Sequence, residues 1–182
     1  MKKLLTAQQV AEALDRLYEL VSSALPRSDP LAVIGIRTRG ETLARRIVER
    51  LRTGRNTPID YGVLDITFYR DDLSLRKGMP LVRATEIDFD LDGKVVLLVD
   101  DVLATGRSVR AAMDALVDFG RPRAIRLAVL VDRGGRELPI AADFVGATLE
   151  GPRGTRVQVH LAEYDGEDGV YLIGKTRKRR KR

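Results

Sequence analysis

The sequence predicts an α/β domain built on a central, mainly parallel twisted sheet that is flanked by helices. Short runs of valine, isoleucine and leucine at residues 31–36, 95–99 and 124–131 are typical of strands buried on both faces. Between these runs lie longer segments with apolar residues at helical spacing. Strands therefore alternate with helices along the chain, which is the pattern of a parallel sheet.

The first element is an amphipathic helix near the N-terminus. Thr6 followed by Gln9 resembles a capping box, and apolar residues then recur at helical spacing up to Leu25. A proline-containing turn over residues 26–30 leads into the strand at 31–36. A second helix is predicted over residues 41–52, and Gly54 closes it.

The middle of the chain continues the alternation. We predict a strand at residues 61–68, and then a charged stretch, 69–80, which loses apolar periodicity and resembles a lid loop. The strand at 95–99 precedes a helix at 108–119, which Gly120 and Pro122 end. After the strand at 124–131 and a glycine-containing turn, three short strands are predicted at residues 143–148, 156–162 and 170–173.

Length and composition predict one domain. The chain has 182 residues, 44% of them hydrophobic, and we assign residues 1–174 to a single globular domain. Cysteine is absent, which excludes disulfides and thiolate chemistry. There is no signal-like start and no apolar run long enough for a membrane span, so we expect a cytoplasmic protein with no membrane partner.

The net charge of +6 is concentrated at the C-terminal end. Residues 175–182 are almost entirely lysine and arginine, whereas the rest of the chain is close to neutral. We expect this basic tail to be disordered. It could attract a polyanion such as nucleic acid, or serve only to keep the protein soluble.

The most informative segment is residues 95–108, where an apolar strand leads through Asp100 and Asp101 into a Thr-Gly turn that opens a helix. Ligands of open α/β sheets bind at the carboxyl ends of the strands. Two carboxylates there can accept hydrogen bonds from sugar hydroxyls and hold hydrated Mg²⁺. The turn offers backbone N–H groups, the hydroxyls of Thr105 and Ser108, and the small Gly106 to a phosphate. A ribose 5-phosphate would satisfy both halves.

A second candidate is the loop after the first central strand. If the strands are parallel, this loop opens on the same edge as the acid pair. Arg39 could present a fork of donors to a pyrophosphate, and the Thr38 hydroxyl would add a neutral donor. The alternative is an ordinary exposed turn arginine.

Other interpretations of these motifs were weighed. The two aspartates could simply cap a helix, or end a Walker-B-type strand. The second interpretation requires a phosphate loop, and residues 169–176 match that pattern literally. The interior of the match is strand-like, however, and too few residues follow it for the required helix. His160 alternates with apolar residues on a predicted strand away from the site edge, so we interpret it as a surface residue rather than a catalyst.

Several motifs together resemble a known family. They are Gly-Ile-Arg-Thr-Arg-Gly at residues 35–40, Leu-Asp-Ile-Thr-Phe-Tyr-Arg-Asp-Asp-Leu at 64–73, the segment 95–108, and Leu-Ala-Val-Leu-Val-Asp-Arg-Gly at 127–134. Residues 95–108 resemble the phosphoribosyl-diphosphate signature of type I phosphoribosyltransferases. The wider set resembles the PyrR family of bifunctional pyrimidine-operon attenuators and uracil phosphoribosyltransferases. The resemblance implies the type I phosphoribosyltransferase fold.

The resemblance also implies a role for each matched position. The ribose 5-phosphate would be bound by the acid pair and the turn, namely Asp100, Asp101, Ala104, Thr105, Gly106, Arg107 and Ser108. Pyrophosphate would contact Thr38, Arg39 and Gly40, and uracil would face Val131, Asp132 and Arg133. The loop at 69–80 would be a flexible hood that places Tyr69, Arg70, Asp71 and Asp72 nearest the reacting centre. Mg²⁺ would be held through pyrophosphate and ribose, aided by Asp100 and Asp101.

The implied reaction makes UMP and pyrophosphate from uracil and phosphoribosyl diphosphate (PRPP), in a homo-oligomer of two or more subunits. The implied regulatory partner is a pyrimidine-operon leader RNA, for which Arg16 and Arg136 are the candidate contacts. Asp15, Glu19, Gly135 and Ala141 depart from the family pattern on that face. Two alternatives stay open: a nucleotide-sensing RNA-binding regulator with little catalysis, or a type I phosphoribosyltransferase that acts on another base.

Overall fold

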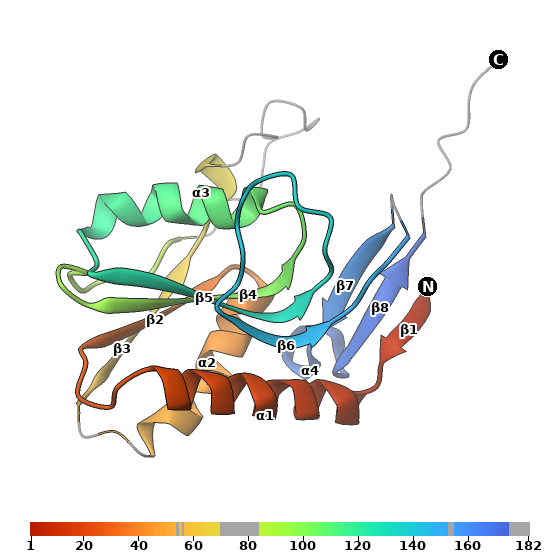
Figure 1. Ribbon diagram of the computed structural model, residues 1–182, viewed down its shortest axis with the longest axis horizontal. Coiled ribbons are helices and arrows are strands. Elements are labelled where there is room, and N and C mark those ends of the chain that lie inside the picture. The colour runs from red at the N-terminus through yellow and green to blue at the C-terminus, as the bar shows by residue number, and fades with distance from the viewer. Residues whose placement is uncertain (54, 56, 70–83, 153–154, 175–182) are drawn as a thin grey trace.

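The computed structural model describes residues 1–53, 55, 57–69, 84–152 and 155–174. At its centre is a five-stranded sheet in the order β3-β2-β4-β5-β6, in which every adjacent pair of strands is parallel. Figure 1 shows this sheet between helices on its two faces. The strands are β2 (Leu31–Ile36), β3 (Ile59–Leu64), β4 (Val95–Leu103), β5 (Ala124–Asp132) and β6 (Phe144–Thr148). The predicted fold class is confirmed.

Three helices cover the sheet. Helices α1 (Ala7–Ala24) and α2 (Arg39–Arg52) lie on one face, and α3 (Arg107–Leu116) lies on the other (Figure 1). Alternate strand residues divide between the two cores, so that in β4 Leu97 packs with α1 and α2 while Leu98 packs with α3. Both faces are therefore apolar, which explains the continuous hydrophobic runs in the sequence.

Helix α1 begins as its sequence predicts. The N–H of Gln9 donates to the Thr6 hydroxyl at 3.3 Å, and the N–H of Thr6 donates to the Gln9 side chain at 2.9 Å. These reciprocal bonds are a capping box. Among the described residues, no helix has the length and apolar character that crossing a lipid bilayer requires.

A second, antiparallel sheet was not predicted. It has the strand order β1-β8-β7 and consists of β1 (Lys2–Leu5), β7 (Arg156–His160) and β8 (Gly169–Ile173). The four-residue helix α4 (Ala162–Asp165) connects β7 to β8. Strand β1 is too short for its own pattern to be distinctive, and its partner β8 lies at the opposite end of the chain. Because β8 occupies residues 169–173, the literal phosphate-loop match is a strand there, as predicted.

Several predicted boundaries were wrong, and the helix expected to begin at residue 41 begins at Arg39. The strand expected over residues 61–68 ends at Leu64, and a single 3₁₀ turn follows at Thr67–Tyr69. The Asp65 carboxylate accepts a hydrogen bond from the N–H of Thr67 at 2.8 Å, which bends the chain out of the sheet. The helix expected over residues 108–119 starts one residue earlier and ends in the 3₁₀ turn Val117–Phe119. The strand expected to reach residue 162 ends at His160. Gly54, the loop at 70–80 and the tail 175–182 lie outside the described residues.

His160 lies on β7 and is partly buried, and its ring centroid is 4.5 Å from that of Tyr171. It therefore packs within the second sheet, rather than standing alone on the surface.

Two glycines allow the start of α2 to approach the central strands closely. A Cβ atom on Gly40 would lie 2.5 Å from the carbonyl oxygen of Val99, and one on Gly35 would lie 2.5 Å from the Cα of Glu41. Real Cβ atoms do not make contacts this short, and the opposing atoms belong to the backbone. These glycines therefore determine how near the loop after β2 comes to the acid-bearing end of β4.

We predict that Gly40→Ala lowers the free energy of unfolding by about 2 kcal/mol or more, because the added methyl group overpacks a backbone contact. Urea denaturation followed by circular dichroism measures this change. Gly174→Ala is the matched control, since a Cβ there would meet no atom within 4 Å. Equal stabilities of the two variants would contradict the proposed close approach.

Candidate active site

A cavity of about 300 Å³ opens at the carboxyl edge of the central sheet. It brings together residues at or just after the carboxyl ends of three different strands, β2, β3 and β4. Its lining consists of Ile36, Arg37, Thr38, Arg39, Asp65, Ile66, Thr67, Asp100, Asp101, Val102 and Ser108. The acid pair, two residues of the predicted pyrophosphate loop and one residue of the predicted phosphate loop thus share one cavity.

The acid pair lies within β4, which continues to Leu103 instead of ending before the aspartates. Asp100 is 7% exposed, and its Oδ1 accepts a hydrogen bond from the N–H of Asp101 at 2.9 Å. Burial raises the pKa of the Asp101 carboxyl, while the Asp100 side chain and the positive charge of Arg39 act in the opposite direction. A buried carboxylate and a partly buried one beside a cation suit a ligand that carries both hydroxyl groups and negative charge.

The turn after β4 presents a helix N-terminus. Gly106 has φ of +90° and precedes α3, and because it has no side chain it cannot cap that helix. The Thr105 hydroxyl accepts a bond from the N–H of Arg107 at 3.3 Å. Of this turn, Ser108 lines the cavity, whereas residues 104–107 lie outside its lining. The helix dipole and first-turn N–H groups favour an anion at this end.

The Arg136 side chain stabilises the turn after β4 through hydrogen bonds. Its guanidinium donates to the carbonyl of Ala104 and, through Nε, to that of Ile140, both at 2.9 Å, and it pairs with the Asp132 carboxylate. The N–H groups of Glu137 and Leu138 add bonds of 3.0 and 3.1 Å to the carbonyl of Thr105. The RNA contact expected of Arg136 stays a prediction. The hydrogen bonds that its guanidinium makes within the protein argue against it.

The residues predicted to face uracil end strand β5, beside β4. Val131 pairs with Val102 and Asp132 with Leu103, and the N–H of Arg133 donates to the carbonyl of Leu103 at 3.0 Å. Val131 is fully buried, while Asp132 and Arg133 are partly exposed. None of the three lines the cavity; Val131 and Asp132 end β5, the strand adjacent to the acid pair, and Arg133 directly follows it.

The loop after β2 carries the predicted pyrophosphate contacts. Thr38 and Arg39 line the cavity, whereas Gly40 is buried against β4. The Arg39 side chain is 25% exposed and makes a bidentate contact with Asp165 of α4, with Nη2 2.8 Å from Oδ1 and Nε 3.2 Å from Oδ2. Arg39 is therefore not an ordinary exposed turn arginine.

Sequence reasoning missed several residues here. Asp65 and Thr67 were assigned to a strand, although they follow β3 at the same sheet edge and lie within a quoted family motif. Arg37 belongs to the predicted candidate loop but was given no role; it lines the cavity and pairs with Glu86 at 2.5 Å. Asp165 gave no signal, because its contact with Arg39 spans 126 positions of the chain.

Of the predicted hood residues, only Tyr69 is described. Its hydroxyl donates to the Asp118 carboxylate beyond α3, and Tyr69 does not line the cavity. Arg70, Asp71 and Asp72 lie outside the described residues.

The described residues contain no group of three or more histidine, cysteine, aspartate or glutamate side chains arranged to hold a metal ion. Asp100 and Asp101 do offer oxygen ligands on the cavity wall. Mg²⁺ is commonly bound by one or two carboxylates together with substrate phosphates, so this donor set fits an ion that arrives with a phosphorylated ligand.

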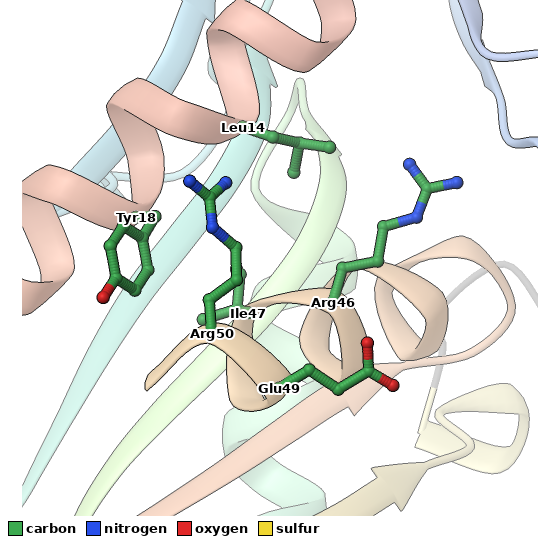
Figure 2. A pocket seen from close by; sticks show the side chains of 6 residues that line it. All are labelled: Leu14, Tyr18, Arg46, Ile47, Glu49 and Arg50. Carbon is green, nitrogen blue, oxygen red and sulfur yellow. The ribbon is translucent and has the colours of Figure 1, made fainter. Parts of the chain in front are cut away.

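A separate groove lies between α1 and α2. Figure 2 shows Tyr18 of α1 and Arg50 of α2 facing each other across it, and the guanidinium carbon of Arg50 lies 4.5 Å from the ring centroid. Arg50 also pairs with Asp15 at 2.6 Å. The negative charge of Asp15, which departs from the family pattern, is therefore compensated locally.

Arg16 is exposed and lines another groove, between α1 and β6.

One edge of the parallel sheet thus carries the acid pair, the turn at residues 104–108 and the loop that leads to Arg39. This combination is typical of proteins that act on a phosphorylated sugar. The model of the phosphoribosyl transferase domain matches residues 1–161. The fold is also shared with the hypoxanthine phosphoribosyltransferases of Staphylococcus aureus and Trypanosoma cruzi. Their TM-scores are 0.68 and 0.67 at 17% and 18% identity, and the alignments cover 96% of this chain and 91% and 97% of theirs.

Relatives of higher sequence identity identify a particular family among the phosphoribosyltransferases. The chain is 48% identical over 176 residues to the bifunctional protein PyrR of a Roseiflexus species, covering 96% of both proteins. It is 51% identical over 170 residues to the bifunctional protein PyrR of Thermus thermophilus, covering 93% of this chain and 94% of that protein. The chain therefore belongs to the PyrR family of the phosphoribosyltransferases.

We predict that Arg136→Met lowers the free energy of unfolding by about 2–3 kcal/mol, because it removes the guanidinium that pairs with Oδ2 of Asp132 and bonds the Ala104 carbonyl. Thermal unfolding monitored by calorimetry measures this loss. Arg126→Met is the control, since Arg126 is half exposed and pairs with Asp143 at the surface; we expect less than about 1 kcal/mol there. Equal losses would contradict a bracing role for Arg136.

Proposed function

We propose that this chain is a uracil phosphoribosyltransferase that also regulates pyrimidine genes through a leader RNA. The observation that carries the enzymatic half is the single cavity lined by Asp100, Asp101 and Arg39. Membership in the PyrR family selects uracil over other bases, since the hypoxanthine enzymes are similar in fold alone. The substrates are PRPP and uracil, and the products are UMP and pyrophosphate.

The acid pair holds the sugar and favours the transition state. Asp100 and Asp101 accept hydrogen bonds from the ribose hydroxyls. As the bond from the anomeric carbon to pyrophosphate breaks, positive charge develops on the ribose ring, and the nearby carboxylates stabilise it. N1 of uracil then bonds to that carbon from the opposite face and loses its proton to the departing pyrophosphate or to water, so the configuration inverts. No covalent intermediate with the protein is required.

The two loops bind the anionic ends of PRPP. The turn at residues 104–108 receives the 5-phosphate at the start of α3. Thr38 and Arg39 receive pyrophosphate, and the guanidinium stabilises the charge that accumulates on the leaving group. Val131 and Asp132 end the adjacent strand β5 and Arg133 follows it, and this segment would face the base. Bound Mg²⁺ would neutralise pyrophosphate charge, with Asp100 and Asp101 beside it.

We predict that the protein makes UMP from uracil and PRPP with Mg²⁺, and that the double variant Asp100→Asn/Asp101→Asn loses activity at least about a hundredfold. Neutral amides cannot supply the negative charge that the developing cation requires. Radiolabelled uracil and product chromatography measure turnover, with hypoxanthine, guanine and orotate as competing bases.

Asp114→Asn is the matched control, because Asp114 lies exposed on α3 and pairs only at 3.6 Å with Arg110. Thermal unfolding confirms that both proteins are folded. Retained activity in the double variant would refute the assigned roles, and turnover of a purine or orotate in preference to uracil would refute the choice of base.

The regulatory half of the proposal rests on the family, whose curated relatives carry the name bifunctional. Arg16 is the described candidate for an RNA contact, since it is exposed on α1. We predict that the protein prefers a pyrimidine-operon leader RNA over a scrambled RNA at 200 mM salt, and that Arg16→Ala weakens this preference.

Filter binding with the two RNAs measures this preference. A protein that lacks residues 175–182 should lose part of its non-specific affinity and keep its preference. Loss of all binding in the shortened protein would instead assign the contact to non-specific attraction by the basic tail.

A further inference from the structure

Asp165 reaches the active site from the second sheet. Its carboxylate contacts the Nε and Nη2 edge of Arg39 through three hydrogen bonds of 2.8 to 3.2 Å. None of the hydrogen bonds described for Arg39 uses Nη1. One edge of the guanidinium is thus held by Asp165, while Arg39 lines the cavity and its charge acts on Asp101.

The carboxylate is itself fixed. Oδ2 of Asp165 accepts a bond from the N–H of Leu161 at 2.9 Å, and the side chain is 16% exposed. Burial alone would raise the pKa of this carboxyl, but the hydrogen bonds from Arg39 and from Leu161 outweigh burial and lower the pKa. Asp165 is therefore charged at neutral pH and has a single orientation.

A second arginine of α2 anchors the helix that carries Asp165. Arg46 lies two turns after Arg39 and donates to Glu163 at 2.6 Å and to Asp168 at 2.7 Å. Asp168 also accepts a bond from the N–H of Ala162, at the start of α4. The four-residue helix is thus held against α2 independently of the Arg39 contact.

We propose that Asp165 is a positioning residue that orients the Arg39 guanidinium toward the pyrophosphate of PRPP. The proposal rests on the proposed function. A bidentate carboxylate fixes the plane of a guanidinium, so Arg39 need not lose rotational freedom when the substrate binds. Without Asp165, Arg39 would keep its charge but lose its preorganised direction. The anion would then have to order a flexible side chain.

The test measures PRPP binding by calorimetry without uracil, together with steady-state kinetics. We expect Asp165→Asn to weaken PRPP binding about tenfold and to raise the KM for PRPP similarly, with the KM for uracil changed less than about twofold. Asparagine can still accept the Leu161 bond but cannot hold both donors of Arg39. Asp165→Glu, which keeps the charge, should recover part of the affinity.

The matched control is Glu163→Gln, on the same helix. Glu163 contacts Arg46, which retains Asp168, so PRPP affinity should stay within about twofold of the wild-type value. The thermal unfolding of each variant shows whether it is folded.

A double-mutant cycle separates positioning from a general structural effect. In an Arg39→Ala background, Asp165→Asn should change PRPP affinity by less than about twofold, because the residue through which Asp165 acts is gone. A tenfold loss in both backgrounds, or no loss in either, would overturn the proposal. If the wild-type protein binds PRPP but makes no UMP, the proposed function fails, while the binding cycle still decides the role of Asp165.

Discussion

The site depends on how closely one loop backbone approaches the end of a neighbouring strand. Gly40 lies against the carbonyl of Val99, directly before the acid pair, and any side chain at this position would push the loop away. Because Thr38 and Arg39 precede Gly40, the same contact places them on the wall of the cavity that Asp100 and Asp101 line. The separation between the cationic and anionic halves of the site is therefore determined by packing of the main chain.

Main-chain packing positions the loops of the site, and two arginine–carboxylate pairs, Arg136–Asp132 and Arg39–Asp165, then orient side chains in them. Arg136 connects the end of β5 to the turn after β4 by bonding both Asp132 and the Ala104 carbonyl. Arg39 is held by Asp165 in the same manner. Both contacts are partly shielded from water, so each restricts a side chain more strongly than a surface ion pair would. Arg136 thus connects the segments that would receive base and phosphate, while Asp165 connects Arg39 to α4.

The sequence predicted the central sheet because its strands are continuous apolar runs, and it predicted the shared edge because parallel strands end together. Asp100, Asp101, Thr38, Arg39 and Ser108 were identified on that basis, and they line one cavity. What periodicity could not predict were contacts between distant segments. Strand β1 depends on pairing with β8, and Asp165 depends on α4 packing against α2. The resemblance implies an RNA contact for Arg136, and no pattern in the sequence indicates the internal partners that this side chain meets in the folded protein.

The pairing of β1 with β8 has a consequence for the order in which the protein matures. Lys2 pairs with Leu172, so β1 has no sheet partner until β8 has been synthesised. The five parallel strands and their helices precede β7 in the chain and can assemble earlier, whereas α4 and its carboxylate arrive with the last segment. During synthesis, the strand that carries the acidic pair therefore becomes available before α4, whose Asp165 contacts Arg39.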